Sequence, residues 1–552
     1  MILSIIIVNY NVKHFLQQCL QSVYKSIGDL GVEIIVVDNN SVDKSIEMLR
    51  EHFPKLKLII NDKNVGFAKA NNQAIKQAKG NYILLLNPDT VIQEDTLIKT
   101  ISFLEQNKKA GALGVKMLDG NGLFLPESKR SLPSPASAFY KIFGLSKLFP
   151  NSKTFGQYHL NYLNNNEVHE VDVLSGAFFM TRKKILDEIG LLDERFFMYG
   201  EDIDLSYRIQ KMGYKNYYVP ITSIIHYKGE STKKTSVNYI ITFYKAMILF
   251  VKKHYKQQNA NPLIFLIQLA ILLRASISLL KRFALKITYP IIDGIIIFFG
   301  LLVIKTIWAK TYFLNENYYS DLFLKFGIPS YITFWIIGIY IQKGYEVPVK
   351  IANLVKGIIS GTIFLLIIYG LLPEQLRFSR ALILFGTIWT LITTYITRKL
   401  FNLLNIDNLK IKSTRPKRIA IISNKIEFQR IQKIIKTTNA NAEDVYQIEI
   451  IKKSNLNKNN HIGHISQLEE IIKIHKIDEI IFSAKDITSN EIIRYMEKIT
   501  NNIEIKIAPT ESTFVIGSNS IHTQGNLYIL NNRQQKKNPI ITYFKKYIDF
   551  FN

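Results

Sequence analysis

Several carboxylates in the first half of the chain stand where an apolar run ends. Asp38 closes the run Val32–Asp38, and Asn39-Asn40-Ser41 follows it. A carboxylate at the end of a strand can accept hydrogen bonds from a nucleobase or a ribose. The sequence Asp-Asn-Asn is also typical of an ordinary turn, so these residues leave a nucleoside site and a turn as alternatives.

Asp89 has a similar setting. The apolar run Tyr82–Leu86 stops at Asn87-Pro88-Asp89, where the proline restrains the backbone. Hard divalent cations take oxygen ligands, commonly one or two carboxylates together with substrate phosphates. Asp89 is placed for that role, and a turn without a ligand is the alternative.

The segment Phe196–Arg208, FFMYGEDIDLSYR, combines aromatic residues with adjacent acids. Glu201 and Asp202 stand at a predicted helix start, where a desolvated carboxylate can act as general base toward a hydroxyl. Acids at this position also compensate the helix dipole. Asp204 and Arg208 have the spacing of an ion pair on the helix surface.

Two further features favour an anionic ligand. Asn64-Val65-Gly66 opens the helical segment Phe67–Ala78, where glycine permits close backbone approach and a helix N-terminus attracts anions. A loop with a cap is the alternative reading of this segment. His226 can bind a metal or a phosphate, although a lone histidine is more often structural. The phosphate role is supported by three nearby lysines, Lys228, Lys233 and Lys234.

These residues lie at the ends of predicted strands and helices, which alternate over residues 1 to about 235. Strands are predicted at Ser4–Asn9, Val32–Asp38, Leu56–Asn61 and Tyr82–Leu86, and helices at Val12–Ser26, Val42–His52 and Phe67–Ala78. The alternation predicts an α/β domain with a parallel-type sheet covered by helices. Ligands of such sheets lie outside the carboxyl ends of the strands, which is where Asn9, Asp38 and Asn87–Asp89 fall.

Composition narrows the class of protein. The 552 residues favour three or four domains. Lys and Arg number 70 against 44 Asp and Glu, and the formal charge of +26 suits an anionic membrane surface or phosphorylated substrates. Nucleic acid is not an expected partner, because the positive charge is spread along the chain and no aromatic-basic motif occurs. The single cysteine, Cys19, excludes an intrachain disulfide framework and fits a reducing compartment.

The middle of the chain predicts membrane segments, and the mean hydropathy of the whole chain is +0.07. Residues 236–288 are expected to form amphipathic membrane-proximal helices, and residues 289–400 a transmembrane region. Four spans are predicted, at 290–308, 327–343, 356–373 and 380–398. Pro262–Leu280 fits either an interfacial helix or a fifth span. The lack of a signal-peptide pattern and Arg398-Lys399 beside the last span predict cytoplasmic soluble domains. Two soluble domains on the same side require an even number of spans, which favours four.

Residues 411–535 turn polar again and predict a small Rossmann-like α/β domain. Strands are expected at Arg418–Ser423, Gln447–Lys452, Glu479–Ser483 and Ile503–Ala508, and helices at Ile426–Lys436, Ser466–His475 and Ser489–Thr500. No glycine-rich phosphate turn follows the first strand, so dinucleotide binding is not expected. His461-Ile462-Gly463-His464 fits a polar loop better than a metal site, and residues 536–552 form a basic tail.

Seven segments, in order, resemble the family 2 glycosyltransferases with a GT-A fold, and especially their rhamnosyltransferase-like branch. They are IIIVNYN, VVDNNS, NVGFAKANNQAI, ILLLNPDT, VLSGAFFMTRKK, FFMYGEDIDLSYRIQKMGY and IIHYKGEST, within residues 1 to about 235. The resemblance implies a nucleotide-sugar donor, a divalent metal (Mn²⁺ or Mg²⁺) and inversion at the anomeric carbon. The Gln-x-x-Arg-Trp motif of processive synthases is absent, so transfer of single sugars is expected.

The resemblance also implies roles for individual residues. Asp202 matches the general base, with Glu201 beside it. Asp89 stands in place of the second acid of the family's Asp-x-Asp motif, and with His226 it would bind the metal. The nucleotide-sugar site would be formed by Val8, Asn9, Tyr10, Asp38, Asn64, Gly66, Asn71, Asn87, Asp89, Ser175, Gly176 and Ala177.

The second half of the chain resembles the front part of polyprenyl-phosphate sugar-phosphate transferases. Four spans, Phe378-Ser379-Arg380 at the start of the last one, and the Rossmann-like unit carry this resemblance. In that family a catalytic domain follows a basic stretch, which Phe544–Phe551 resembles. Since the sequence stops there, residues 411–552 are expected to have no catalytic role.

The expected protein is therefore a multi-pass glycosyltransferase of the cytoplasmic (inner) membrane. It would move one sugar, with a dTDP-rhamnose-like donor favoured, to a lipid-linked or cell-surface polysaccharide precursor. Polysaccharide-assembly proteins are the other expected partners. The alternatives are a non-enzymatic membrane scaffold of a polysaccharide-assembly complex and a partner subunit of a sugar-phosphate transferase.

Overall fold

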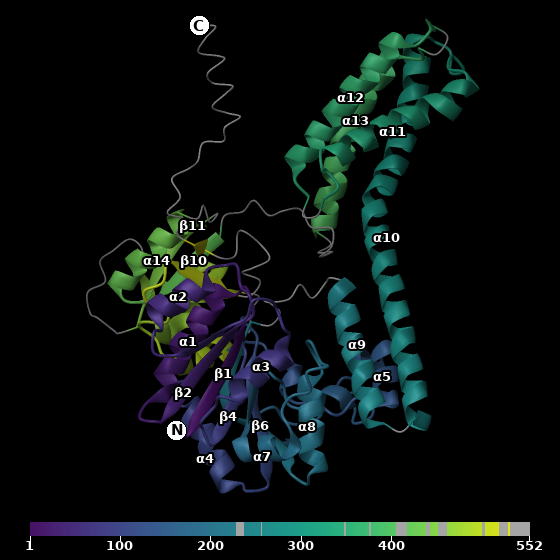
Figure 1. Cartoon of the computed structure of the whole chain (residues 1–552). Coiled ribbons are helices and arrows are strands. Elements are labelled where there is room, and N and C mark those ends of the chain that lie inside the picture. The colour runs from purple at the N-terminus through teal and green to yellow at the C-terminus, as the bar shows by residue number, and fades with distance from the viewer. Residues whose placement is uncertain are drawn as a thin grey trace. The chain divides into compact units, whose positions relative to one another are not determined.

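The structure is a computed structural model of the chain (Figure 1). It describes residues 1–227, 237–255, 257–346, 349–374, 377–403, 417–437, 442–450, 461–499, 503–517 and 528–529. Two compact units are present: Met1–Ile271 with Pro416–Asn552, and Leu272–Arg415. The lysines at 228, 233 and 234 and the predicted tail 536–552 lie outside the described residues.

The N-terminal part of the first unit contains a nine-stranded sheet. Four of its strands are parallel, in the order β3-β2-β1-β4, with β1 at Leu3–Asn9, β2 at Val32–Asp38, β3 at Lys57–Ile60 and β4 at Tyr82–Leu86. Asn9 stands beside Asp38 in the β1–β2 ladder, so the predicted polar ends of two strands meet. All residues of β1 are buried, as expected for a strand that is covered on both faces.

Beyond β4 the sheet becomes mixed, and the prediction of a parallel-type sheet is wrong for this part. The remaining strands are β5 (Thr90–Ile92), β6 (Ala110–Leu118), β7 (His169–Val171), β8 (Phe178–Arg182) and β9 (Lys215–His226). β8 is antiparallel to β4 and β6, whereas β9 is parallel to β6 and antiparallel to β5 and β7. These pairings join segments far apart in the sequence, and strand–helix alternation carries no information about them.

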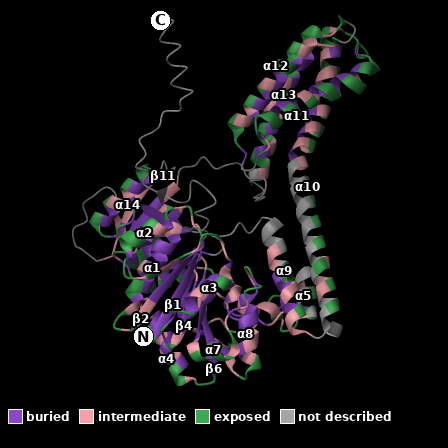
Figure 2. Cartoon of the chain, in the orientation of Figure 1, coloured by how far each residue is buried: buried purple, intermediate pink, exposed green. Residues whose placement is uncertain are grey.

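Helices lie on both faces of this sheet (Figures 1 and 2). They include α1 (Lys13–Ile27), α2 (Ser45–His52), α3 (Phe67–Ile75), α4 (Thr96–Gln106), α7 (Lys183–Ile189) and α8 (Glu201–Lys211). Ile5 and Ile7 of β1 belong to one apolar core with α1, whereas Ile6 belongs to another with α3. Successive side chains of a strand point to opposite faces, so one strand supplies both cores. The connection between β6 and β7 contains α5 (Pro135–Ile142) and α6 (Leu145–Leu148).

The C-terminal part of the first unit contains a second sheet of seven strands, which confirms the predicted second α/β domain. The strands are β10 (Lys417–Ile422), β11 (Ala442–Glu449), β12 (His461–His464), β13 (Glu479–Ser483), β14 (Glu504–Ala508), β15 (Phe514–Gly517) and β16 (Tyr528–Ile529). The helices are α14 (Lys425–Thr437), α15 (Leu468–His475) and α16 (Ser489–Lys498). The order β12-β11-β10-β13-β14 is parallel throughout and is Rossmann-like, and the unpredicted β15 and β16 extend it in antiparallel fashion.

The prediction of a polar loop at His461–His464 is wrong, because these residues form the edge strand β12. Four residues with a central glycine are too short for a clear strand pattern, and pairing with β11 decides the conformation. The His464 ring contacts the Ile450 carbonyl oxygen at 2.6 Å and the Ser466 hydroxyl at 2.9 Å. The ring of His464 therefore serves the local fold.

The second unit contains helices with the length and composition of membrane spans. The helices are α11 (Ile328–Ile341), α12 (Ile351–Leu371), α13 (Arg380–Leu403) and the part of α10 (Gln257–Tyr312) that begins at Leu272. Within the described residues, four helical segments are long and apolar enough to cross a membrane, at Ile287–Tyr312, Phe323–Ile341, Ile351–Leu371 and Arg380–Phe401. They coincide with the four predicted segments. Pro262–Leu280 belongs to the first part of α10 and is not among them.

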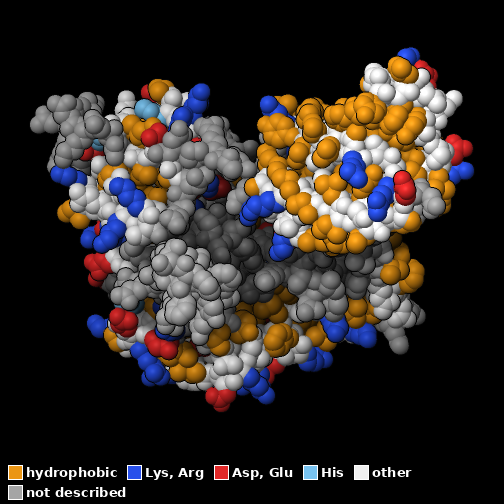
Figure 3. Space-filling model, turned by 90° about the horizontal axis from the view of Figure 1, so that it is seen from above, with side chains coloured by type: hydrophobic (Ala, Val, Ile, Leu, Met, Phe, Trp, Pro, Cys, Tyr) orange, Lys and Arg blue, Asp and Glu red, His pale blue; other side chains and the backbone are white. Residues whose placement is uncertain are grey.

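The surface of these helices is apolar. Phe299, Phe364 and Ile392 expose more than half of their area, and hydrophobic side chains cover much of the helical unit in Figure 3. In water such a surface would be unfavourable, whereas lipid tails match it. The helical unit therefore fits a membrane environment.

A buried ion pair between α10 and α13 involves Arg398, which the sequence analysis used to predict the cytoplasmic side of the membrane. The Arg398 guanidinium contacts the Asp293 carboxylate at 2.6 Å through one of its two hydrogen bonds, and both residues are buried. The guanidinium also lies 4.1 Å from the ring centre of Tyr289. Since Asp293 neutralises Arg398, this arginine is a weaker indicator of the cytoplasmic side than its position in the sequence implies.

Candidate active site

The ends of β1 and β2 form a buried polar cluster. The Asn9 amide donates hydrogen bonds to Asp38 at 2.7 Å and to the Ser41 hydroxyl at 3.0 Å. The Ser41 N–H donates to the other Asp38 oxygen at 2.8 Å. Val8 is buried, whereas Tyr10 is 38% exposed. The cluster holds the loops after both strands together, and nucleotide binding by these residues stays a prediction.

Gly66 joins the start of α3 to the loop before α8. Its φ is +89°, and a Cβ at this position would lie 2.7 Å from the carbonyl oxygen of Phe197. The Phe67 N–H donates to that same oxygen at 2.7 Å. The sequence assigned the close approach at Gly66 to a ligand, but in this structure the backbone of Phe197 makes it. Asn64 accepts a hydrogen bond from the Gly66 N–H, and the Asn71 amide bonds within α3.

Asp89 and His226 come together because β5 and β9 pair, with Thr90 opposite His226. The Nε2 atom of His226 lies 3.4 Å from an Asp89 carboxylate oxygen and 3.5 Å from the Asn87 amide nitrogen. Asp89 and His226 are both buried, and the Nδ1 atom of His226 has no hydrogen-bond partner in the described part of the chain.

This pair fits a divalent cation that takes its other ligands from water and substrate phosphates. A carboxylate and an imidazole are both suitable ligands, and Mg²⁺ or Mn²⁺ commonly uses few protein side chains in phosphate-binding sites. No group of three or more His, Cys, Asp and Glu side chains suited to a metal occurs among the described residues. The pair would therefore depend on a bound diphosphate to complete the coordination.

The turn Ser175–Ala177 connects this pair to the start of α8. The Ala177 carbonyl accepts a hydrogen bond from the Asn87 N–H at 3.0 Å, and the Gly176 N–H donates to Asp202 at 3.3 Å. A Cβ at Gly176 would lie 3.6 Å from the Asp202 Cβ atom. The tertiary structure thus brings two predicted segments, at Asn87 and at Asp202, within hydrogen-bond reach of a third, the turn Ser175–Ala177.

Arg130 is a site residue that the sequence analysis missed. Its guanidinium contacts the Asp202 carboxylate at 2.5 Å and donates to the Leu174 carbonyl at 2.8 Å. Burial lowers the pKa of Arg130, but the charge of Asp202 outweighs this and holds the pKa above its ordinary value. The only signal in the sequence was the basic pair Lys129-Arg130, since the partner carboxylate lies far along the chain.

Glu201 and Asp202 have different surroundings. Glu201 is 7% exposed, and burial, followed by the nearby Asp202 charge, holds the pKa of Glu201 well above its ordinary value. Asp202 keeps 15% of its side chain exposed and has Arg130 as a partner. Asp202 is therefore the better placed of the two to meet a substrate hydroxyl.

Asp204 pairs with Arg208 as its spacing indicated, but the pair is not on the helix surface. Asp204 is fully buried and contacts three cationic or titratable groups: Arg208 at 2.8 Å, and Lys253 and His254 at 2.6 Å. Lys253 and His254 end helix α9 (Val237–His254). Asp204 thus ties the helix that carries Asp202 to α9, a contact that periodicity along α8 alone does not reveal.

Replacing Arg130 with methionine is expected to destabilise the protein as well as impair it. Removing one partner of a buried ion pair typically costs about 3–5 kcal/mol, because the other charge is left unpaired. The midpoint of thermal unfolding of Arg130→Met should lie below that of wild type. Transfer activity, measured at a temperature where both proteins are folded, should also be lower in the variant. Arg195→Met, which removes an exposed guanidinium from its pair with Asp193, is the control and should change the midpoint little. An unchanged midpoint in Arg130→Met would contradict a stabilising role for the Arg130–Asp202 ion pair.

The Asp204 contacts predict a pH-dependent stability. Burial raises the pKa of Asp204, but hydrogen bonds from Lys253 and His254 and the charge of Arg208 outweigh it, so the pKa lies below its ordinary value. A depressed pKa stabilises the folded state above the unfolded value of about 3.9 and is lost as the pH falls through the folded value. Asp204→Asn should therefore lower the unfolding midpoint at pH 7, and the difference from wild type should shrink below about pH 4. The exposed Asp187→Asn is the control, and a pH-independent difference would disprove the reading.

Comparison with known proteins defines the class. Residues 4–190 match the family model for glycosyl transferase family 2. The sheet, with its polar residues at the carboxyl ends of β1, β2 and β4, is a GT-A-like domain. The resemblance expected from the sequence is confirmed for this domain, which makes the chain a glycosyltransferase.

Curated relatives of this domain include rhamnosyltransferases. An N-acetylglucosaminyl-diphospho-decaprenol L-rhamnosyltransferase of Mycobacterium tuberculosis is 25% identical, over 50% of this chain and 92% of the relative. Rhamnosyltransferase WbbL of Escherichia coli (strain K12) is 27% identical, over 40% of this chain and 82% of the relative. The crystal structure of S. aureus TarS matches at 18% identity with a TM-score of 0.32, over 48% of this chain and 42% of that chain.

Proposed function

We propose that the protein is a membrane-anchored inverting glycosyltransferase that moves one sugar from a nucleotide-diphosphate donor to a lipid-linked or cell-surface polysaccharide precursor. One observation carries the proposal: the turn Ser175–Ala177 is hydrogen-bonded to Asn87 on one side and to Asp202 on the other. These two hydrogen bonds support a metal-and-diphosphate position next to a base position.

The chemistry follows from these positions. Asp202 would accept the proton of the acceptor hydroxyl. The hydroxyl oxygen would bond to the anomeric carbon while the bond from that carbon to the donor diphosphate breaks. Arg130 would hold the Asp202 carboxylate in place. Asp89 and His226 would hold a divalent cation, which when bound neutralises charge on the departing diphosphate. Asp38, with Asn9, would orient the nucleoside.

Several observations support finer assignments. The two relatives named above are rhamnosyltransferases, and one bears a diphospho-decaprenol acceptor in its name. This favours a dTDP-rhamnose-like donor and a polyprenyl-diphosphate-linked acceptor. Four apolar helices fit anchoring in the cytoplasmic membrane, with both soluble domains on the cytoplasmic face, where nucleotide sugars are made. Residues 1–235 would be the transferase domain and residues 289–400 the anchor.

The decisive experiment uses the full-length chain in nanodiscs. Thermal unfolding is measured with dTDP-rhamnose and with UDP- and GDP-sugars, each with and without Mn²⁺, and transfer to a polyprenyl-diphospho-N-acetylglucosamine acceptor follows. One donor that raises the unfolding midpoint only with Mn²⁺, and is consumed only with acceptor, would support the proposal. A folded chain that binds none of these donors would overturn it.

A further inference from the structure

In the Rossmann-like domain, side chains of the domain itself occupy the crevice where such folds usually bind a ligand. In open α/β sheets, ligands bind at the carboxyl ends of the strands where the strand order reverses, which here is between β10 and β13. Glu427 is 2% exposed at this point and accepts hydrogen bonds from Arg430 at 2.7 and 2.9 Å. Arg430 in turn donates to the Pro509 carbonyl at 3.1 Å. The crevice is thus closed by the domain's own ion pair.

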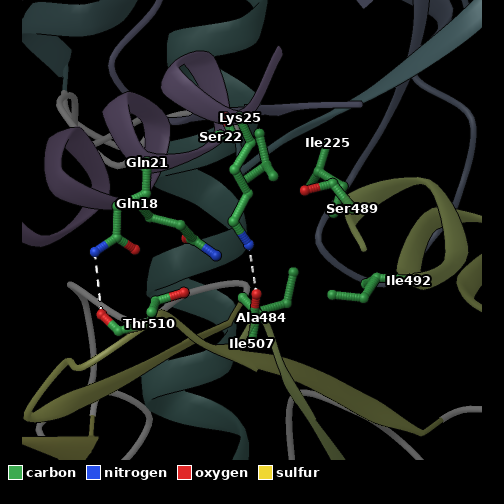
Figure 4. Close-up of a pocket in the computed structure, with 11 residues that line it drawn as sticks. Gln18, Gln21, Ser22, Lys25, Ile225, Ala484, Ser489, Ile492, Ile507 and Thr510 are labelled. Atoms are coloured by element: carbon green, nitrogen blue, oxygen red, sulfur yellow. Dashed lines mark hydrogen bonds between the residues drawn. The ribbon is translucent and has the colours of Figure 1, made fainter. Parts of the chain in front are cut away.

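The same edge of the sheet receives helix α1 of the transferase domain, which belongs to the same compact unit. Lys25 donates a hydrogen bond to the Ala484 carbonyl at 2.6 Å, and Gln21 donates to the Thr510 carbonyl at 3.1 Å. Ala484 directly follows β13, and Thr510 lies two residues beyond the end of β14. Figure 4 shows these α1 side chains directed toward the strand ends. The cavity left between them has about 20 Å³, which is room for one water and not for a nucleotide.

A second contact ties the domain to the segment just after Asp89. Both oxygens of Glu94 accept backbone hydrogen bonds from the start of α16, from Ser489 at 2.7 Å and from Asn490 at 3.0 Å. The neighbouring Gln93 donates to the Asn490 side chain at 3.2 Å. A carboxylate at a helix N-terminus is favourable because it meets free N–H groups and the helix dipole.

An apolar core lies between these polar contacts and is common to both domains. Val91, Ile225 and Tyr227 of the transferase domain share one buried cluster with Ile492 and Phe514 of the Rossmann-like domain. Because side chains alternate along a strand, these residues occupy the opposite side of the β5–β9 ribbon from Thr90 and His226. The C-terminal domain therefore covers the back of the ribbon that carries Asp89 and His226.

We propose that the C-terminal Rossmann-like domain is a positioning module for the metal-binding ribbon of the same chain, with the ligand edge of its sheet used to bind α1. The proposal rests on the proposed function, because it concerns the Asp89–His226 pair. Without this cover, apolar residues of β5 and β9 would face water and the ribbon would lose its support. The domain would thus set metal affinity while taking no part in the chemistry.

The test compares full-length wild type with Glu94→Lys. The new cation would face the N-terminus of α16 and weaken the contact. Loss of a group that supports metal ligands typically costs 10–100-fold in metal affinity. We expect the Mn²⁺ concentration for half-maximal transfer to rise about tenfold or more, with kcat at saturating Mn²⁺ little changed. Glu105→Lys, at an exposed position of α4, is the control for charge and should match wild type. Glu94→Gln, which keeps an acceptor oxygen, should recover most of the wild-type Mn²⁺ requirement.

Hydrogen exchange of β5 and α16 reports whether the contact has opened. An opened contact with an unchanged Mn²⁺ requirement would overturn the proposal. If Glu94→Lys leaves exchange unchanged, Ile492→Asp, a buried position of the shared core, removes the cover whether the domain detaches or unfolds. An unchanged Mn²⁺ requirement in that variant would also overturn it. If wild type binds no nucleotide sugar, the proposed function fails separately, since the binding of Mn²⁺ together with inorganic pyrophosphate, measured by thermal shift, still tests the ribbon.

Discussion

Asp202→Asn is expected to reduce sugar transfer by about 10²–10⁴-fold while donor binding persists. Asparagine preserves the shape of the side chain and can still contact Arg130, but it cannot take a proton from the acceptor hydroxyl. Transfer is measured as release of nucleoside diphosphate in the presence of acceptor, and donor binding as the Mn²⁺-dependent rise of the unfolding midpoint. The separation of these two readouts identifies a role in the chemical step.

Two matched variants make this result specific. Asp187→Asn carries the same change at an exposed position on α7 and should retain full activity. Glu201→Gln tests the neighbouring carboxylate, whose raised pKa and burial predict a smaller effect than that of Asp202→Asn. Full transfer by Asp202→Asn would remove it as the base, and a larger loss in Glu201→Gln would move that role to Glu201.

Asp89→Ala is expected to abolish the Mn²⁺-dependent part of donor binding, with transfer reduced at least about 100-fold. Losing residues that merely support ligands costs 10–100-fold in metal affinity, so losing a direct carboxylate ligand should cost at least that much. His226 alone would remain, and a single imidazole holds a cation poorly at a site completed by phosphates. Calorimetric titration of Mn²⁺ with the donor analogue present measures the change.

The control for Asp89→Ala is a double-mutant cycle, which compares Asp89→Ala, His226→Ala and the variant with both changes. If both residues hold one cation, each single variant should remove most of the metal-dependent binding, and the double variant should be little worse than either. Donor binding that stays Mn²⁺-dependent in Asp89→Ala would refute the ligand role. Additive losses would indicate two separate sites.

The local patterns predicted the first seven elements of the transferase domain, from β1 to β4 with the helices between them. β1, β2 and β4 are strongly apolar, and the structure places each within a residue of its predicted bounds. Hydrophobic periodicity is a property of neighbouring residues, so it survives without knowledge of the fold. The antiparallel strands β5, β7 and β8 were not predicted, because they are short and their conformation depends on pairing with distant segments.

The sequence alone determined the residue types at the site. Asp38, Asp89, Asp202 and His226 stand out because carboxylates and an imidazole end apolar runs or open a helix, and the order of the motifs indicated family 2. The four apolar helices were equally clear, because about 20 apolar residues in a row have few other uses. These features belong to the chain itself.

Only the tertiary structure decided which residues meet. The pairing of Asp89 with His226 depends on the β5–β9 ladder, and the Arg130 contact with Asp202 depends on a long connection folding back. The burial of Asp204 depends on α9, and the cover over the ribbon depends on the C-terminal domain. Long-range contacts such as these are set by the packing of the whole core, to which each residue contributes only part of the free energy, so no local pattern specifies them.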